Sequence, residues 1–291
     1  MTAVDTEMTA WPERLYDAYV FDMDGTIYLG DHLLPGAKRL IEELRRRGIP
    51  VRFLSNNPTK DPGQYVEKLG MLGLPTPVEE IANTVVTTTR WLLENKPGQT
   101  VFPIAEEPLK RAFARAGIRM SEDPSEIDVV VASYDRTFDY RKLQIAFDAI
   151  WFYKRAVLIA TNPDRFCPFP GGRGEPDCAA IIAAIEACTG ARCEMVVGKP
   201  DPVMLGAALG GLDVDPANCV MVGDRIMTDI QMAVNTGMCS AMPLTGESTL
   251  AEAVALDAAH RPTHVLDRVD RLIPKALWDE IGWTEDNDPI N

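Results

Sequence analysis

Residues 19–28 read YVFDMDGTIY, and this stretch decides the fold. Its first half is apolar and β-prone, as expected of a strand covered by helices on both faces, and Gly25 releases the chain into a turn. Asp22 and Asp24 are therefore expected at the carboxyl end of a buried strand. Ligands bind at that edge of an open α/β sheet, so two costly charges there indicate chemistry rather than packing.

The two carboxylates are one residue apart, so they share one face of an extended segment. With no Cys or His cluster nearby, a hard divalent cation bound through oxygen, above all Mg²⁺, is their natural counter-charge. One carboxylate can then attack a phosphoryl group while the other handles protons. The alternative is an acidic turn that only caps the next element, because such turns are common.

The composition sets outer bounds on function. The 291 residues suffice for two domains, and 46% hydrophobic with 25% charged residues is ordinary for a globular protein. The formal net charge of −14 argues against a nucleic-acid polymer or an anionic membrane as partner, since both demand a basic face. No stretch approaches about 18 uninterrupted apolar residues, and the N-terminus lacks a signal-peptide pattern. A soluble, cytoplasmic protein is expected.

The cysteines indicate a reducing compartment. They lack the paired C-x-x-C spacing of a zinc site, and two of them fall in apolar runs where free cysteine acts as a small hydrophobe. We therefore expect free thiols rather than metal ligands or disulfides. The six residues are Cys167, Cys178, Cys188, Cys193, Cys219 and Cys239.

A second polar cluster follows the next predicted strand. A strand is expected at residues 49–54, and Ser55, Asn56 and Asn57 come directly after it, ahead of a helix. A hydroxyl and amides at that point can hold phosphate oxygens together with the free N–H groups of the helix. The alternative is that they only cap the helix. Further helices are expected at residues 37–47, 64–72 and 78–93.

From residue 97 onward the pattern restarts. Strands are expected at residues 100–104, 128–133 and 157–161, alternating with helices at 107–116 and 140–153. This alternation predicts a second α/β unit inserted into the first.

A long loop rich in Gly and Pro, TNPDRFCPFPGGRGEP, covers residues 161–176. Loops of this length inside compact domains tend to be functional. Asn162, Asp164, Arg165 and Phe166 offer acceptors, a cation and an aromatic face that can read a leaving group. The alternative is a solvated connection with two buried Phe anchors.

Two further strand ends carry charges. The predicted strand at residues 193–197 ends in Gly-Lys-Pro with Lys199, for which a surface lysine is the alternative. The strand that ends near residue 222 is followed by Asp224 and Asp229. These two carboxylates would arrive where a metal bound by Asp22 needs further oxygen ligands.

Taken in order, the charged strand ends resemble the four signature motifs of the haloacid dehalogenase (HAD) superfamily. They are D-x-D-G-T at residues 22–26, Ser55, Lys199 and G-D-x-x-x-T-D at residues 223–229. The inserted unit, with FLSNN, TNPD and VVGKP, is similar to subfamily IIA, which includes NagD-type nucleotide phosphatases, AraL-type sugar phosphatases and pyridoxal phosphate phosphatase. The resemblance runs from about residue 16 to residue 277.

The resemblance implies an α/β fold in which a Rossmann-like HAD core with a parallel sheet carries an inserted α/β cap of the C2a type. The implied core is residues 1–96 and 194–291, and the implied cap is residues 97–193. An exposed apolar surface of this cap offers a route to a homodimer.

The resemblance also implies roles for the acidic residues. Asp22 is the implied nucleophile that forms an aspartyl-phosphate, and Asp24 is the acid that protonates the leaving oxygen and then activates water. The implied Mg²⁺ ligands are Asp22, Asp224 and the main-chain carbonyl of Asp24. Asp229 would reach the ion directly or through water.

Ser55, Asn56 and Lys199 are the implied binders of the transferred phosphoryl group, and Lys199 would also neutralise the nucleophile. Phosphoryl transfer depends mostly on positioning and charge stabilisation, and this set supplies a metal, a cation and hydroxyl or amide donors. The implied function is a Mg²⁺-dependent phosphatase for a small phosphorylated metabolite such as a nucleotide monophosphate or a sugar phosphate.

One departure leaves the substrate open. Many relatives carry a P-G-x-G-like segment after the specificity loop, whereas residues 175–178 read EPDC. Two other functions stay in play. One is a phosphotransferase that passes the phosphoryl group to an alcohol, and the other is a noncatalytic phosphometabolite-binding protein, which the intact charged motifs disfavour.

Overall fold

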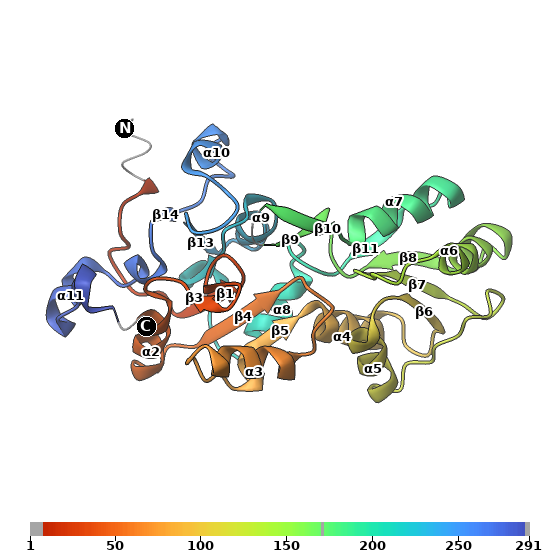
Figure 1. The fold of residues 1–291 in the computed structure, drawn as a ribbon, viewed down its shortest axis with the longest axis horizontal. Helices are drawn as coiled ribbons and strands as arrows, with labels where there is room; N and C mark the ends of the chain where they lie inside the picture. Colours follow the sequence, from red (N-terminus) through yellow and green to blue (C-terminus); the bar gives the residue numbers. More distant parts are fainter. Residues whose placement is uncertain (1–7, 170–171, 289–291) are drawn as a thin grey trace. The chain divides into compact units, whose positions relative to one another are not determined.

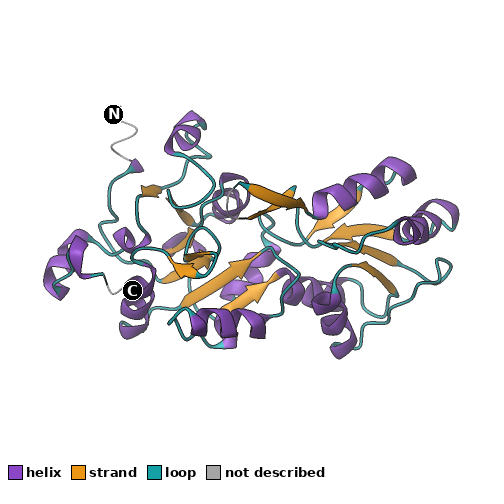
Figure 2. Cartoon of the chain, in the orientation of Figure 1, coloured by secondary structure: helices purple, strands orange, loops and turns teal. Residues whose placement is uncertain are grey.

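The computed structural model describes residues 8–169 and 172–288 of the chain. These residues form two compact units. The first is drawn from residues 1–54, 66–81 and 208–291, and the second from residues 55–65 and 82–207. Strands and helices alternate over much of the described chain (Figures 1 and 2).

A six-stranded sheet runs in the order β14-β13-β12-β1-β4-β5. The central strand β1 pairs in parallel with β12 on one side and with β4 on the other. Tyr19, Val20 and Phe21 of β1 are fully buried, which explains why this strand is apolar on both faces. The strands are β1 Ala18–Asp22, β4 Val51–Ser55, β5 Ile81–Asn83, β12 Cys219–Val222, β13 Cys239–Pro243 and β14 His264–Leu266.

A four-stranded parallel sheet, in the order β11-β8-β7-β6, forms the centre of the second unit. Val129 and Val131 of β7 pack with α4 and α5, whereas Val130 and Ala132 pack with α6 and α7. Successive residues of one strand therefore serve two hydrophobic cores, one on each face. The strands are β6 Val101–Ile104, β7 Val129–Ala132, β8 Val157–Ala160 and β11 Cys193–Val196.

Helices cover these sheets. Leu40, Ile41 and Leu44 form the buried stripe of α2, and Arg45 and Arg46 lie in its last turn, where positive charge is favoured. The helices are α2 Ala37–Arg46, α3 Pro62–Met71, α4 Thr84–Asn95, α5 Glu107–Arg115, α6 Tyr140–Phe147, α7 Cys178–Thr189, α8 Val203–Leu209, α9 Gln231–Thr236, α10 Leu250–Ala255 and α11 Lys275–Ile281.

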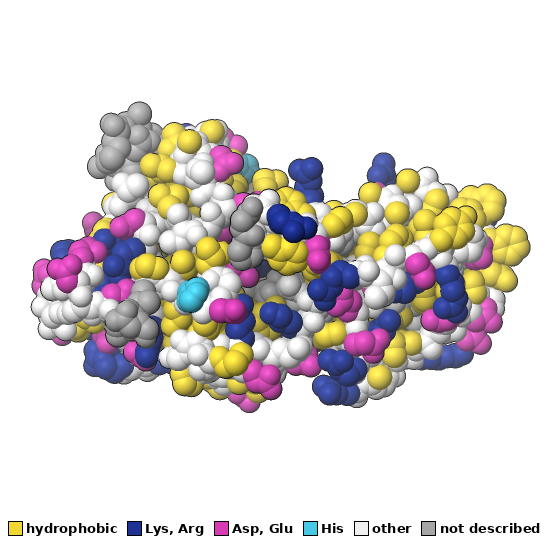
Figure 3. Space-filling model, in the orientation of Figure 1, with side chains coloured by type: hydrophobic (Ala, Val, Ile, Leu, Met, Phe, Trp, Pro, Cys, Tyr) yellow, Lys and Arg dark blue, Asp and Glu magenta, His cyan; other side chains and the backbone are white. Residues whose placement is uncertain are grey.

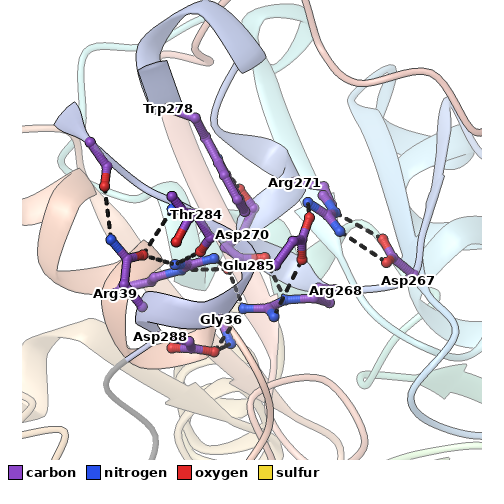
Figure 4. A network of polar contacts seen from close by, with 12 residues as sticks. Gly36, Arg39, Asp267, Arg268, Asp270, Arg271, Trp278, Thr284, Glu285 and Asp288 are labelled. Carbon is purple, nitrogen blue, oxygen red and sulfur yellow. Dashed lines mark hydrogen bonds and ion pairs between the residues drawn. The ribbon is translucent and has the colours of Figure 1, made fainter. Parts of the chain in front are cut away.

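The C-terminal segment packs against α2 through a buried ion pair (Figure 4). Arg39 is 4% exposed and donates from Nε to Oδ2 of Asp270 over 2.6 Å. The guanidinium also lies over the rings of Trp278 and Trp283, with its central carbon 4.5 and 4.8 Å from the ring centroids. A second arginine, Arg268, donates to the same carboxylate over 2.8 Å. The charge of Asp270 is thereby compensated inside the first unit.

The predicted fold class is confirmed, and two elements differ in detail. Residues 78–93 were expected to form one helix, but they contain a 3₁₀ turn, Val78–Glu80, then β5, and α4 begins only at Thr84. The Asn83 side chain accepts a hydrogen bond from the N–H of Val86 and so caps α4. The strand expected at residues 193–197 is β11, which ends at Val196 and pairs with β8 in the four-stranded sheet.

The loop at residues 161–176 is partly regular. It contains an antiparallel hairpin of β9 Phe166–Phe169 and β10 Arg173–Pro176, and residues 170 and 171 lie outside the described residues. None of the six cysteines forms a disulfide, as expected. Over the described parts of the chain, helices are too short or too polar to cross a membrane. Residues 1–7 and 289–291 also lie outside the described residues.

Candidate active site

Three carboxylates of the first unit meet at the carboxyl edge of the six-stranded sheet. Asp22 is the last residue of β1, while Asp224 and Asp229 follow β12. Each offers one oxygen, and these oxygens lie within 4.8 Å of one another. Asp224 is 3% exposed and Asp229 is fully buried. Like charges this close in a shielded position repel strongly, so the arrangement favours a bound cation.

Main-chain donors hold two of these carboxylates in place. The N–H of Glu247 donates to Oδ2 of Asp224 over 2.7 Å, and the N–H of Arg225 donates to Oδ2 of Asp229 over 3.1 Å. Asp229 lies within a π-helical turn, Ile226–Ile230, a distortion often found at functional sites. The site is therefore positioned by the loops after β12 and β13.

Glycine is required where the backbone touches these side chains. A Cβ on Gly246 would lie 2.0 Å from Oδ2 of Asp224, and a Cβ on Gly223 would lie 2.2 Å from Cγ of Asp229. Such contacts are impossible without displacing the carboxylates. The glycines therefore allow the main chain to pack directly on the acidic group.

The donor set fits Mg²⁺. It consists only of carboxylate oxygens, which hard divalent cations prefer, and it contains no Cys or His. The Asp24 side chain is exposed and is not one of the three grouped carboxylates. Its expected contributions, a main-chain ligand and a carboxyl for proton transfer, remain predictions.

In the second unit, Ser55 and Asn57 engage in local hydrogen bonds. The Ser55 hydroxyl accepts from the N–H of Asn57 over 3.1 Å and lies 3.0 Å from the hydroxyl of Tyr65. The Asn57 side chain accepts from the N–H of Thr59 over 2.9 Å. These bonds form local turns and do not cap α3, which begins at Pro62 and at whose start Asp61 accepts from the N–H of Gln64. The phosphate role of Ser55 stays a prediction.

Lys199 is buried, with 2% exposure, so it is not a surface lysine. Its N–H donates to Oδ1 of Asn56 over 2.8 Å, and its carbonyl accepts from Nδ2 of the same side chain over 3.1 Å. Nδ2 of Asn56 also donates to Oδ2 of Asp164 over 2.9 Å. The second unit thus brings together three of the predicted site residues.

The four predicted specificity residues divide into two kinds. Asn162 is fully buried and donates to both Asp164 and Asp177, over 2.9 and 3.0 Å. Arg165 and Phe166 are exposed, the first before the hairpin and the second on it. The alternative of two buried Phe anchors is wrong, because Phe166 and Phe169 are 46% and 40% exposed.

Two residues that the sequence analysis did not single out support the hairpin. Asp177 caps α7, a position signalled by an acid directly before an apolar helical run. Tyr134 donates its hydroxyl to Glu175 of β10. Burial raises the pKa of Tyr134 well above its usual range, and the hydrogen bond to Glu175 adds to this effect, so the hydroxyl stays protonated.

Comparison with known proteins agrees with this geometry. The haloacid dehalogenase-like hydrolase family model matches residues 19–119, and a HAD-hydrolase-like model matches residues 196–272. An acid sugar phosphatase from Staphylococcus aureus is 35% identical over 239 residues, which is 82% of this chain and 90% of that protein.

Solved structures are also similar. A 4-nitrophenylphosphatase from Thermotoga maritima matches with a TM-score of 0.82 and 32% identity, covering 88% of this chain and 96% of that one. NagD from E. coli matches with a TM-score of 0.78 and 25% identity, covering 88% and 98%. The chain therefore belongs to the haloacid dehalogenase-like hydrolases. Within that family it is an enzyme of the NagD-like subfamily IIA, whose relatives here are named phosphatases.

Proposed function

We propose that this enzyme is a Mg²⁺-dependent phosphatase that hydrolyses a small phosphorylated metabolite through an aspartyl-phosphate at Asp22. The observation that supports this most is the carboxylate group of Asp22, Asp224 and Asp229, which combines a potential nucleophile with an oxygen-only cation site. These three residues would hold the ion, with the main-chain carbonyl of Asp24 as a further ligand. When bound, the ion would supply positive charge that lets carboxylate and phosphate oxygens approach.

The proposed reaction has two steps. The Asp22 carboxylate attacks phosphorus, and the bond to the leaving oxygen breaks as Asp24 gives that oxygen a proton. Asp24, now a carboxylate, takes a proton from water, and this water attacks the aspartyl-phosphate. Inorganic phosphate is released and Asp22 is regenerated.

Lys199, Ser55 and Asn56 are proposed to bind the phosphoryl oxygens. Lys199 is buried, and a buried ammonium group is stable only beside negative charge, such as a phosphate dianion. Both side-chain N–H groups of Asn56 already donate within the protein. Its proposed contact with phosphate is therefore assigned to the main chain.

The substrate class follows from the relatives' names and from the hairpin. The relatives include an acid sugar phosphatase and 4-nitrophenylphosphatases, which supports phosphomonoesters of modest size. Arg165 and Phe166 offer a cation and an aromatic face for the leaving group. We place the enzyme in the cytoplasm.

A homodimer through the inserted unit is also part of the proposal. Trp151, Phe152 and Tyr153 are 53%, 64% and 48% exposed beside α6, and Figure 3 shows hydrophobic side chains gathered over that region. Burial of such a patch against a second copy would remove apolar surface from water. Sedimentation of the wild type and of Trp151→Ser tests it.

Phosphate release from a panel of substrates tests the activity. Sugar phosphates, nucleotide monophosphates, glycolate phosphate, pyridoxal phosphate and 4-nitrophenyl phosphate are assayed with Mg²⁺ and with EDTA. Asp22→Asn should lower kcat on the order of 10³-fold or more, because the nucleophile is lost. Asp31→Asn changes an exposed acid nearby and serves as the matched control. Full activity of Asp22→Asn would overturn the proposal.

The same panel tests specificity and the fate of the phosphoryl group. Arg165→Ala and Phe166→Ala should change the ranking of substrates, and an unchanged ranking would remove these residues from substrate selection. Addition of acceptor alcohols separates hydrolysis from phosphotransfer. A phosphorylated alcohol in place of inorganic phosphate would assign the enzyme to the phosphotransferases.

A further inference from the structure

The Asn56 side chain clamps the main chain of Lys199. Its Oδ1 accepts from the Lys199 N–H, and its Nδ2 donates to the Lys199 carbonyl. The second hydrogen of Nδ2 goes to Asp164. A primary amide has only two N–H donors, so both are engaged within the protein. Two hydrogen bonds to the N–H and C=O of one residue fix its main chain, and they also fix the point from which its side chain projects.

Asn56 is itself held firmly. The hydroxyl of Thr84, a fully buried residue at the start of α4, donates to the Asn56 carbonyl over 2.8 Å. On the other side of the clamp, a Cβ on Gly198 would lie 2.8 Å from Oδ1 of Asn56 and 2.5 Å from the carbonyl of Thr161. The main chain at Gly198 therefore packs directly against both the Asn56 amide and the Thr161 carbonyl.

The clamp continues to both ends of the β9–β10 hairpin. Oδ2 of Asp164 accepts from Asn56 and from Asn162, each over 2.9 Å. Asn162 also donates to Asp177, whose N–H donates to the carbonyl of Arg165 over 3.1 Å. Asp164 precedes the hairpin and Asp177 follows it. One continuous series of hydrogen bonds thus connects the lysine to the base of the hairpin.

We propose that Asn56 and Asp164 are positioning residues for Lys199, through which the hairpin and the phosphate-binding lysine are held in one fixed arrangement. The proposal rests on the proposed function and deepens it. Asn56 acts through Lys199 rather than through its own side chain on the substrate. Because the lysine would contact the phosphoryl group that all phosphomonoesters share, its misplacement affects every substrate equally.

A double-mutant cycle tests the clamp. Asn56→Ala should lower kcat/KM about 10- to 100-fold, as expected when a charge-stabilising group is displaced by about 1 Å. In a Lys199→Met background the same change should lower kcat/KM less than about 3-fold, because the residue that Asn56 positions is gone. A full additional loss in that background would overturn the proposal. Asn95→Ala, which removes an exposed local contact with the carbonyl of Trp91 at the end of α4, is the matched control.

A second variant distinguishes the loss of this contact from a misfolded protein. Asn56→Asp keeps the shape and the acceptor for the Lys199 N–H, but it loses both donors and faces the Asp164 carboxylate. Its loss of kcat/KM should match that of Asn56→Ala with an unchanged circular dichroism spectrum, and wild-type activity would contradict the clamp.

The Asp164→Asn variant tests whether Asp164 positions Lys199 or contacts the leaving group of the substrate. The change should lower kcat/KM by the same factor for 4-nitrophenyl phosphate and for a sugar phosphate. A factor that differs strongly between these leaving groups would show that Asp164 reads the substrate instead.

An NMR measurement separates the clamp from the proposed function. In protein labelled with [¹³Cε]lysine, Lys199 is assigned by its absence in Lys199→Arg. The Lys199 resonance should move in Asn56→Ala while the other lysine resonances stay in place, and an unmoved resonance would overturn the clamp. This measurement does not depend on catalysis. If the wild type were inactive, the proposed function would be wrong, and the NMR result would still test whether Asn56 positions Lys199.

Discussion

The N–H of Glu247 donates to Oδ2 of Asp224 over 2.7 Å, and the N–H of Ser248 donates to the Asp224 carbonyl over 3.1 Å. A loop that follows β13 therefore fixes a carboxylate that follows β12. This support explains how the Asp224 carboxylate, with 3% exposure, keeps one orientation beside the carboxylates of Asp22 and Asp229.

Removal of one carboxylate should weaken the binding of Mg²⁺. In Asp224→Asn, activity should fall on the order of 10²-fold or more, since a charged ligand is lost. The metal-free form should unfold at a higher temperature than the metal-free wild type, because repulsion among the carboxylates is reduced. Calorimetric titration with Mg²⁺ and thermal unfolding with and without EDTA measure both effects. A Mg²⁺ affinity equal to that of the wild type would exclude Asp224 as a ligand.

Gly246→Ala should displace the same carboxylate without changing any charge. The new Cβ would lie 2.0 Å from Oδ2 of Asp224, so the loop or the side chain must move. We expect activity to fall about 10- to 100-fold. Gly70→Ala is the matched control, because Gly70 lies in α3 with open space around its Cβ position. That control should keep full activity and raise stability by about 0.5–1 kcal/mol. Equal activity of the two variants would contradict the prediction.

The buried ion pair should contribute far more than an exposed one. Asp270→Asn leaves the Arg39 guanidinium buried without its counter-charge, so the free energy of unfolding should fall by about 3–5 kcal/mol. Glu94→Gln breaks the exposed pair with Arg90 and should cost less than about 1 kcal/mol. Urea unfolding of both variants measures the difference. Losses of equal size would mean that Asp270 is not needed to compensate Arg39.

His264 should make the fold sensitive to mild acid. Burial lowers its pKa below the usual range, and its Nε2 lies 2.7 Å from the Tyr16 hydroxyl. Below about pH 6.5 the unfolded chain takes up a proton that the folded chain resists, so the free energy of unfolding should fall as the pH decreases. His264→Gln should remove this part of the slope, and His32→Gln, at an exposed position, should not. Unfolding curves between pH 5 and 8 test this, and identical slopes would refute it.

The elements of the site that follow buried strands could be predicted from the sequence. Asp22 and Asp224 each come directly after an apolar run, and parallel strands bring such positions to one edge of the sheet. Strands β6, β7 and β8 were also expected in the inserted unit, because each is an apolar run, whereas β11 was expected as a strand without its pairing to β8. Short apolar runs that end in polar or turn-forming residues were sufficient to predict these strands.

The contacts between side chains of distant segments could not be predicted. Asn56 and Asp164 are 108 residues apart, and their hydrogen bond depends on the folded loops rather than on local sequence. Strand β5 was missed because it has only three residues and adjoins a helix, so a short strand and a helical turn give the same pattern. Its pairing in the sheet overrides the local preference.

The ion pair of Arg39 has a consequence for shortening the chain. Trp278, Trp283 and Thr284, whose rings and carbonyl contact the guanidinium, all lie beyond residue 272, where the second family match ends. A chain shortened at residue 272 would lack the two rings and the carbonyl that contact Arg39 of α2. The family match therefore ends before the residues that cover this buried arginine, and shortening the chain to that boundary should destabilise the first unit.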